Sequence, residues 1–148
     1  MPYDLVKGIL ADYDNEVRYS VMSKSSRNQG GKHVLVDFFG VDPALLRNQG
    51  RLMRTLKAAL KQGGFTIIRQ SDSHKFRTGG QGVTGFFMLA QSHAAFHSYP
   101  EFGYFALDIY SCGSHDPKPV AEAMRGLLRP RRVSRLFHRR GLKAFGAA

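Results

Sequence analysis

The sequence predicts an α+β fold, a two-layer sandwich in which an antiparallel sheet carries helices on one face. Segments of strand-like composition outnumber the segments in which apolar residues recur at helical spacing. Strands with only two interspersed helices fit a single sheet with those helices on one side. The other face of the sheet then needs a cover, so we expect two sheets to stack in a dimer.

The first predicted strand lies at residues 32–39, where β-branched and aromatic residues dominate. Residues 1–31 before it are predicted to be an N-terminal extension that is partly flexible. Residues 20–31 are rich in Ser, Asn, Gln and Gly, a composition typical of a linker. Residues 3–17 are compatible with a short helix.

A helix is predicted to begin at Asp42 and Pro43, a capping residue followed by proline at the first helical position. Apolar residues recur at helical spacing from there to Leu60, and Gly63 and Gly64 end the helix. The chain after these glycines is predicted to form a second strand, at 65–70.

Residues 76–82 contain three glycines and are predicted to form a flexible loop. A third strand is predicted at 83–91; it is apolar on both faces and therefore central. A fourth, at 104–111, alternates apolar and polar residues. A last helix is predicted to begin at Asp116 and Pro117 and to end before Pro130.

The net charge of +11 is unevenly distributed, because no acidic residue follows Glu122. We therefore divide the chain into the extension, a domain at 32–128 and a basic C-terminal tail at 129–148. A basic tail can hold phosphates by counterion release, or it can be solvated or pair with acidic groups on a partner subunit. No nucleic-acid recognition motif accompanies it, so nucleic acid is not the expected partner.

Composition also bears on the cellular setting. No apolar run approaches the ~18 residues that a membrane span needs, and no secretory signal is recognisable. The single cysteine, Cys112, is predicted to be a free thiol in a reducing compartment. We therefore expect a cytoplasmic protein that does not enter membranes.

Reactive side chains cluster in one part of the sequence and predict a site there. They are Ser92, His93, His97, Glu101, Asp108, Cys112 and His115. Several of them suggest a metal site, but no CxxC pair or carboxylate-rich triad supports it, and no metal is predicted. A serine or cysteine hydrolase is another interpretation, although Ser92 lacks the G-x-S-x-G elbow.

A series of short motifs resembles, in order, those of the prokaryotic S-adenosylmethionine decarboxylase proenzymes. The strings are GKHVLVDF at 31–38, HKF at 74–76, GVTG at 82–85, SH at 92–93, HSYPE at 97–101 and DIYSCG at 108–113. Each string is weak alone. The intervals from Ser92 to His97, Glu101 and Cys112 make the series specific, and the similarity spans about residues 31–128.

The resemblance implies a proenzyme that cleaves itself before Ser92. The serine hydroxyl attacks the preceding carbonyl, and elimination leaves residues 1–91 with an ordinary carboxyl end and residues 92–148 with a pyruvoyl group derived from Ser92. The pyruvoyl ketone forms a Schiff base with the substrate amine and accepts the electrons left when carbon dioxide departs. The implied product is decarboxylated S-adenosylmethionine for spermidine synthesis.

The resemblance also implies roles for individual residues. His97 removes the serine α-hydrogen, and the hydroxyl of Thr84 assists processing through a hydrogen bond. Cys112 reprotonates the product carbon, so its removal is expected to spare cleavage and to lower turnover. Glu101 accepts bonds from the ribose hydroxyls of the substrate, and Phe76 stacks on its adenine.

The chain departs from the family pattern at several positions. Gln91 stands where glutamate usually precedes the cleaved serine, Tyr99 stands where tryptophan or phenylalanine is common, and the loop after Phe76 is longer than usual. Two alternatives therefore stay open: a pyruvoyl-dependent ornithine or arginine decarboxylase, and an uncleaved, non-catalytic homologue that binds a nucleoside or a partner. For the enzyme we expect a homodimer of processed two-chain protomers.

One geometric requirement follows from the spacing. Ser92 and His97 are five residues apart, so a regular strand would point them to opposite faces. Both reach one site only if the chain turns or bulges between them.

Overall fold

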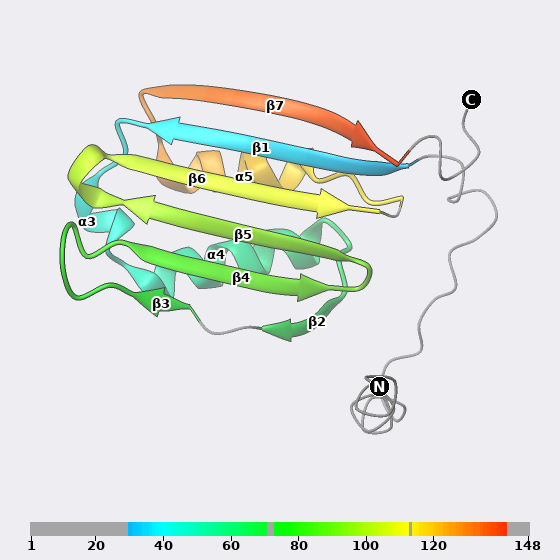
Figure 1. The fold of residues 1–148 in the computed structure, drawn as a ribbon, viewed down its shortest axis with the longest axis horizontal. Coiled ribbons are helices and arrows are strands. Elements are labelled where there is room, and N and C mark those ends of the chain that lie inside the picture. Colours follow the sequence, from blue (N-terminus) through cyan, green and yellow to red (C-terminus); the bar gives the residue numbers. More distant parts are fainter. Residues whose placement is uncertain (1–29, 71–72, 113, 142–148) are drawn as a thin grey trace, which may run out of the picture.

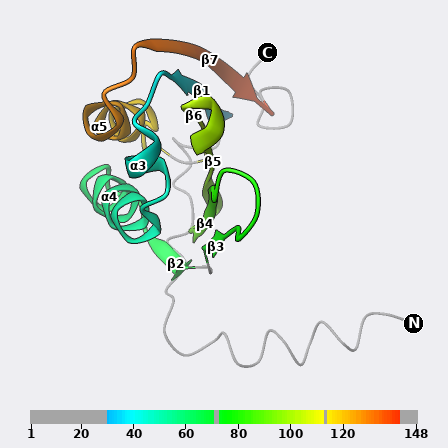
Figure 2. The same ribbon diagram turned by 90° about the vertical axis from the view of Figure 1, so that its left-hand side faces the viewer.

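One seven-stranded antiparallel sheet forms the first layer of the fold, and the helices cover only one of its faces (Figure 1). The structure is a computed structural model that describes residues 30–70, 73–112 and 114–141. Figure 2 shows the helices on a single side of the sheet, which confirms the predicted fold class. The helix expected at 3–17 lies outside the described residues.

The order of the strands places the first strand between β6 and the edge strand β7. The order is β2-β4-β5-β6-β1-β7, and β3 also pairs with β4. The strands before the last helix are β1 (Gly31–Phe39), β2 (Ile67–Gln70), β3 (His74–Lys75), β4 (Val83–Leu89), β5 (Ser92–Tyr99) and β6 (Tyr104–Ser111). A short 3-10 helix, η1 (Pro100–Phe102), connects β5 to β6. β5 was not among the predicted strands, and the strand predicted at 83–91 ends at Leu89.

The single helix predicted after β1 is two helices. They are α3 (Pro43–Leu46), which Asp42 caps as expected, and α4 (Gln49–Gln62). The break arises because the side chain of Asn48 accepts a hydrogen bond from the amide of Arg51 and so begins a new helix. The prediction of one continuous helix was therefore wrong, although the apolar spacing that suggested it does face the core.

The basic segment after the last helix differs from its prediction as a tail. The helix itself, α5 (Lys118–Leu128), matches the expected range. Beyond it, β7 (Arg132–Arg140) pairs with β1 along its whole length. Several of its cationic side chains have partners that suit a strand: the guanidinium of Arg132 lies 4.4 Å from the ring centroid of Phe39, and Arg135 pairs with Glu122. The sheet therefore extends past residue 128.

The hydrophobic core lies between the helices and the covered face of the sheet. Its largest fully buried side chains are Phe38, Phe87, Phe96, Phe105, Leu46, Leu52, Leu56, Leu60, Leu107, Ile109, Met124 and Leu128. The uncovered face, called the open face below, carries polar side chains and the exposed apolar residues Phe86, Met88 and Tyr99. None of the helices in the described ranges has the length and apolar character needed to cross a membrane.

Candidate active site

The turn between β4 and β5 holds a strained residue. Ala90 and Gln91 form this turn, and Leu89 and Ser92 pair directly across it. Gln91 has a φ of +57°, in the left-handed region that L residues other than glycine rarely adopt. That conformation costs roughly 1–2 kcal/mol. Strain is therefore stored at the residue whose carbonyl is predicted to be attacked.

Strand β6 brings the cysteine to this turn, because Ser92 pairs with Ser111. The thiol of Cys112 donates a hydrogen bond to the backbone carbonyl oxygen of Gln91. The amide of Cys112 donates to Oγ of Ser92 over 3.3 Å. Gln91, Ser92 and Cys112 form what we call the serine cluster. In it the thiol lies where it polarises the carbonyl that precedes the serine.

A second polar pair lies at the other end of β5. Thr84 of β4 and His97 of β5 are direct cross-strand partners on the open face. Oγ1 of Thr84 lies 2.9 Å from Nδ1 of His97. This hydrogen bond fixes the orientation of the imidazole and leaves Nε2 as the nitrogen that can face a reacting group.

Thr84 and His97 line a cavity of about 570 Å³ together with Phe76 and Glu101. We call these four residues the histidine pocket. They come from separate parts of the chain: the loop after β3, the strands β4 and β5, and η1. The ring of Phe76 is 48% exposed. An aromatic surface and a carboxylate in a cavity of this size suit a nucleoside-like molecule.

The glycine loop between β3 and β4 forms one wall of the histidine pocket. A Cβ atom at Gly80 would collide with the carboxylate of Glu101, and one at Gly82 would collide with the carbonyl oxygen of Ser98. Nε of Arg47 donates to the carbonyl oxygen of Gly80 over 3.0 Å and holds the loop in place. The absence of a side chain at position 80 therefore leaves room for the Glu101 carboxylate where it lies.

One chain does not bring the serine cluster and the histidine pocket together. β5 runs without a break from Ser92 to Tyr99, and its register with both neighbouring strands is uninterrupted. Five residues at about 3.3 Å each separate Ser92 from His97 by about 16 Å, and they point to opposite faces. The turn or bulge that convergence requires is not formed in β5. The serine cluster and the histidine pocket therefore lie apart within one chain.

On the open face, two residues of the predicted reactive cluster, His93 and Asp108, lie beside His33 and Tyr110, which were not among the predicted site residues. The rings of His33, His93 and Tyr110 have centroids 5.7–6.2 Å apart. Burial lowers the pKa of His33, and the charge of Asp108, 3.9 Å from Nε2, opposes that shift in part. In the sequence, these residues are marked only by the alternation of side chains along three strands. The order of the strands in the sheet is needed to show that they lie together.

The residues considered for a metal site are scattered. His93 and His97 lie on the open face, Cys112 belongs to the serine cluster, and His115 packs on the ring of Phe65. Within the described ranges, no three or more His, Cys, Asp or Glu side chains are arranged to hold a metal ion.

Several known proteins that are similar to this chain are S-adenosylmethionine decarboxylase proenzymes. The family described as S-adenosylmethionine decarboxylase matches residues 32–141. The S-adenosylmethionine decarboxylase proenzyme of Thermoplasma volcanium is 42% identical over 99 residues, which cover 67% of this chain and 72% of that protein. The proenzyme of Methanococcus vannielii is 36% identical over 115 residues, covering 77% of this chain and 92% of that protein.

A solved structure is also similar to this chain. The crystal structure of the adenosylmethionine decarboxylase from Aquifex aeolicus matches with a TM-score of 0.62 and 32% identity, covering 76% of this chain and 92% of that one. The fold, the strained turn beside a serine and a thiol, and these matches define a carboxy-lyase made as a proenzyme. The chain belongs to the S-adenosylmethionine decarboxylase family. The match to the family extends over β7. These relatives give no support to ornithine or arginine as the substrate.

Proposed function

We propose that this chain is a self-cleaving, pyruvoyl-dependent decarboxylase that converts S-adenosylmethionine to its decarboxylated form, which supplies spermidine synthesis. The observation that carries the proposal is the serine cluster. There the carbonyl of a strained Gln91 accepts a hydrogen bond from Cys112 and immediately precedes the partly buried Ser92. Ordinary side chains supply no ketone, so the chain itself must provide one.

Self-cleavage begins with attack of Ser92 Oγ on the carbonyl carbon of Gln91, which exchanges the amide for an ester. Loss of the α-hydrogen of residue 92 then breaks the ester and leaves Gln91 with a free carboxylate. Water converts the resulting dehydroalanine end to a pyruvoyl group and releases ammonia. The left-handed φ of Gln91 favours the first step because breaking the amide releases strain, and the Cys112 thiol stabilises the negative charge on oxygen.

The residues around position 92 fit a pyruvoyl group formed there. The group, once formed, supplies a carbonyl that accepts the electrons released by decarboxylation. Cys112 holds a proton beside this position and can deliver it to the product carbon. Gln91, in place of the usual glutamate, leaves these steps intact because the attacked atom belongs to the backbone.

A second copy of the chain completes the site in this proposal. His97 of the same chain lies about 16 Å from Ser92. Two copies that stack through their open faces, with their β5 strands antiparallel, bring the turn before Ser92 of one copy beside the histidine pocket of the other. Ser92 itself lies on the covered face of β5, so this turn rearranges when the site forms. The exposed side chains of Phe86, Met88 and Tyr99 lie on that face and would be buried in the interface. Each dimer then holds two sites.

Carbon dioxide release from carboxyl-labelled S-adenosylmethionine, ornithine and arginine tests the substrate. We expect release from S-adenosylmethionine alone, because the histidine pocket offers Phe76 for a base and Glu101 for ribose hydroxyls. Release from ornithine or arginine instead would overturn the substrate assignment. Cleaved protein that releases nothing from any of the three would overturn the decarboxylase proposal itself.

Replacement of Cys112 by alanine is expected to slow cleavage about tenfold and to lower turnover of the cleaved protein about a hundredfold. The effect on turnover is the one that the family resemblance implies. We expect an effect on cleavage as well, because the thiol contacts the carbonyl of Gln91. A time course on a denaturing gel gives the cleavage rate, and kcat of the processed fraction gives the second effect. Cys112→Ser keeps a donor and should restore cleavage more than turnover. Unchanged rates in Cys112→Ala would remove the thiol from the mechanism.

A further inference from the structure

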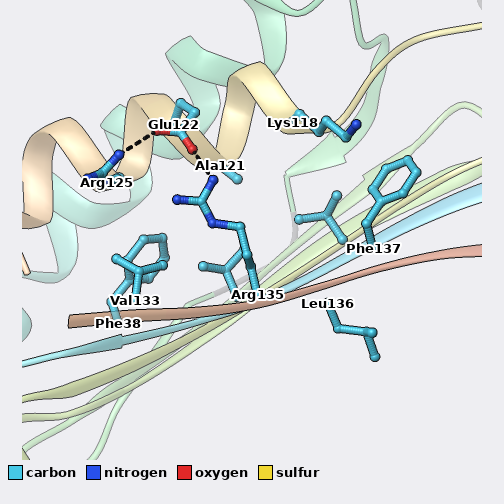
Figure 3. Close-up of a pocket in the computed structure, with 11 residues that line it drawn as sticks. Phe38, Lys118, Ala121, Glu122, Arg125, Val133, Arg135, Leu136 and Phe137 are labelled. Carbon is cyan, nitrogen blue, oxygen red and sulfur yellow. Dashed lines mark hydrogen bonds and ion pairs between the residues drawn. The ribbon is translucent and has the colours of Figure 1, made fainter.

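A groove between α5 and β7 exposes apolar surface on the helix side of the sheet (Figure 3). The groove exists because β7 extends the sheet past β1, and no helix of the described residues lies over it (Figure 2). Its volume is about 390 Å³. The floor consists of Val34, Val36 and Phe38 of β1 with Val133 and Phe137 of β7. The ring of Phe137 is 41% exposed.

The rim of the groove is basic. Lys118 and Arg125 of α5 and Arg135 of β7 line the groove together with a single carboxylate, Glu122. Glu122 pairs with Arg135 over 2.8 Å and with Arg125 over 3.3 Å. Nζ of Lys118 lies 4.2 Å from the ring centroid of Phe137. Three cations and one carboxylate leave a net charge of +2. The groove therefore suits an occupant that has an apolar stripe bordered by acidic groups.

Residues 3–17 of the same chain have this pattern. Their apolar stripe is Tyr3, Val6, Leu10, Tyr13 and Val17. Spacings of three and four residues place such a stripe on one face of a helix. The segment contains four acidic residues and one lysine, a net charge of −3, and it holds four of the eleven acidic residues of the protein. At 100° per residue, Asp14 lies about 20° beyond one edge of the stripe, with Lys7 next to it. Glu16 lies about 60° beyond the other edge, past Ile9.

The connection between this segment and the groove is long enough. The chain enters β1 at Gly31, which pairs with Arg140 at the end of β7, so it arrives beside one end of the groove. The link from residue 18 to residue 30 spans at most about 40 Å when extended. The nine residues of β7 span about 30 Å. The segment therefore reaches any part of the groove of its own chain.

We propose that residues 3–17 form an amphipathic helix that docks in the groove between α5 and β7 of the same chain. The stripe covers Val133 and Phe137, and Asp14 and Glu16 approach Arg125 and Arg135. Docking buries the apolar surface that the helix layer leaves open on this side. The tether favours this occupant over a second copy, since it keeps the segment at a high local concentration.

Disulfide trapping in the full chain tests the proposal. On a Cys112→Ser background, Leu10→Cys is combined with Ala121→Cys, because Ala121 lines the groove on α5. The matched control combines Gly8→Cys with Ala121→Cys, since position 8 falls on the opposite side of the predicted helix. We expect the 10–121 disulfide to form at least about tenfold faster than the 8–121 disulfide. Peptide mapping by mass spectrometry reads both, whether or not the chain has been cleaved.

Equal rates for the two pairs would overturn the proposal. A mixture of isotope-labelled and unlabelled chains shows whether the docked segment belongs to the same chain or to a second copy. Disulfides that join labelled to unlabelled chains would assign the groove to a second copy instead. Arg135→Glu should slow the 10–121 disulfide several-fold, and an unchanged rate would contradict the charge contacts. If Ala121→Cys does not fold, Val133→Cys presents a thiol to the same groove from β7.

Discussion

Replacement of Ser92 by alanine is expected to leave the chain whole and without decarboxylase activity. The hydroxyl is the group that attacks the strained Gln91 carbonyl, and the ketone derives from the same residue, so both functions disappear together. Intact-mass measurement of the purified protein checks this result. The wild type should give fragments of residues 1–91 and 92–148, with the second fragment blocked at its amino end.

A serine elsewhere in the chain provides the control for this experiment. Ser134 lies exposed on β7, and Ser134→Ala should be cleaved and active like the wild type. Fragments from Ser92→Ala would show that a different bond is cut. A wild-type chain that stays whole would favour the non-catalytic alternative.

Co-expression of Ser92→Ala with His97→Ala is expected to restore activity to about a quarter of the wild-type value, although each variant alone is inactive. In a dimer whose sites combine the serine cluster of one copy with the histidine pocket of the other, a mixed pair has one intact site out of two. Random pairing makes half of the dimers mixed, which gives the factor of about four. The prediction follows from the separation of about 16 Å between the two residues along β5.

Different affinity tags on the two variants allow the mixed dimer to be purified and its kcat measured. Co-expression of Ser92→Ala with Cys112→Ala is the matched control. Both residues belong to the serine cluster, so no site of that mixed dimer is intact, and activity should not rise above the low level of Cys112→Ala alone. A Ser92→Ala and His97→Ala mixed dimer that forms but stays inactive would contradict the shared site.

The elements that could be predicted from sequence are those with local signals. β1 and β6 alternate apolar residues, and α5 begins beside Asp116, whose side chain accepts a hydrogen bond from the amide of Lys118. β5 was missed because polar and apolar residues do not alternate cleanly along it: Ser98 points inward, whereas Ala95 and Tyr99 point outward. β7 was missed because four arginines dominate it, and their contacts with aromatic rings on neighbouring strands cannot be seen before the strands are paired.

The membership of the candidate site could be predicted, but its distribution in space could not. The motif intervals identify Ser92, His97 and Cys112 without saying whether the strand between the first two is straight. That answer depends on the unbroken pairing of β5 with both neighbours. The contact between Cys112 and Gln91 likewise depends on the pairing of Ser92 with Ser111, which are far apart in the chain.

The strand order has a consequence for the protein once it has been cut. Residues 1–91 supply β1, which lies between β6 and β7, and both of these come from residues 92–148 (Figure 1). β4 of the first piece also pairs with β5 of the second. Strands of the two pieces therefore alternate within one sheet, and the pieces separate only if the hydrogen bonds between these strands are broken. After cleavage of the one peptide bond, a denaturing gel should show two bands, whereas under native conditions the two pieces should stay together as one complex.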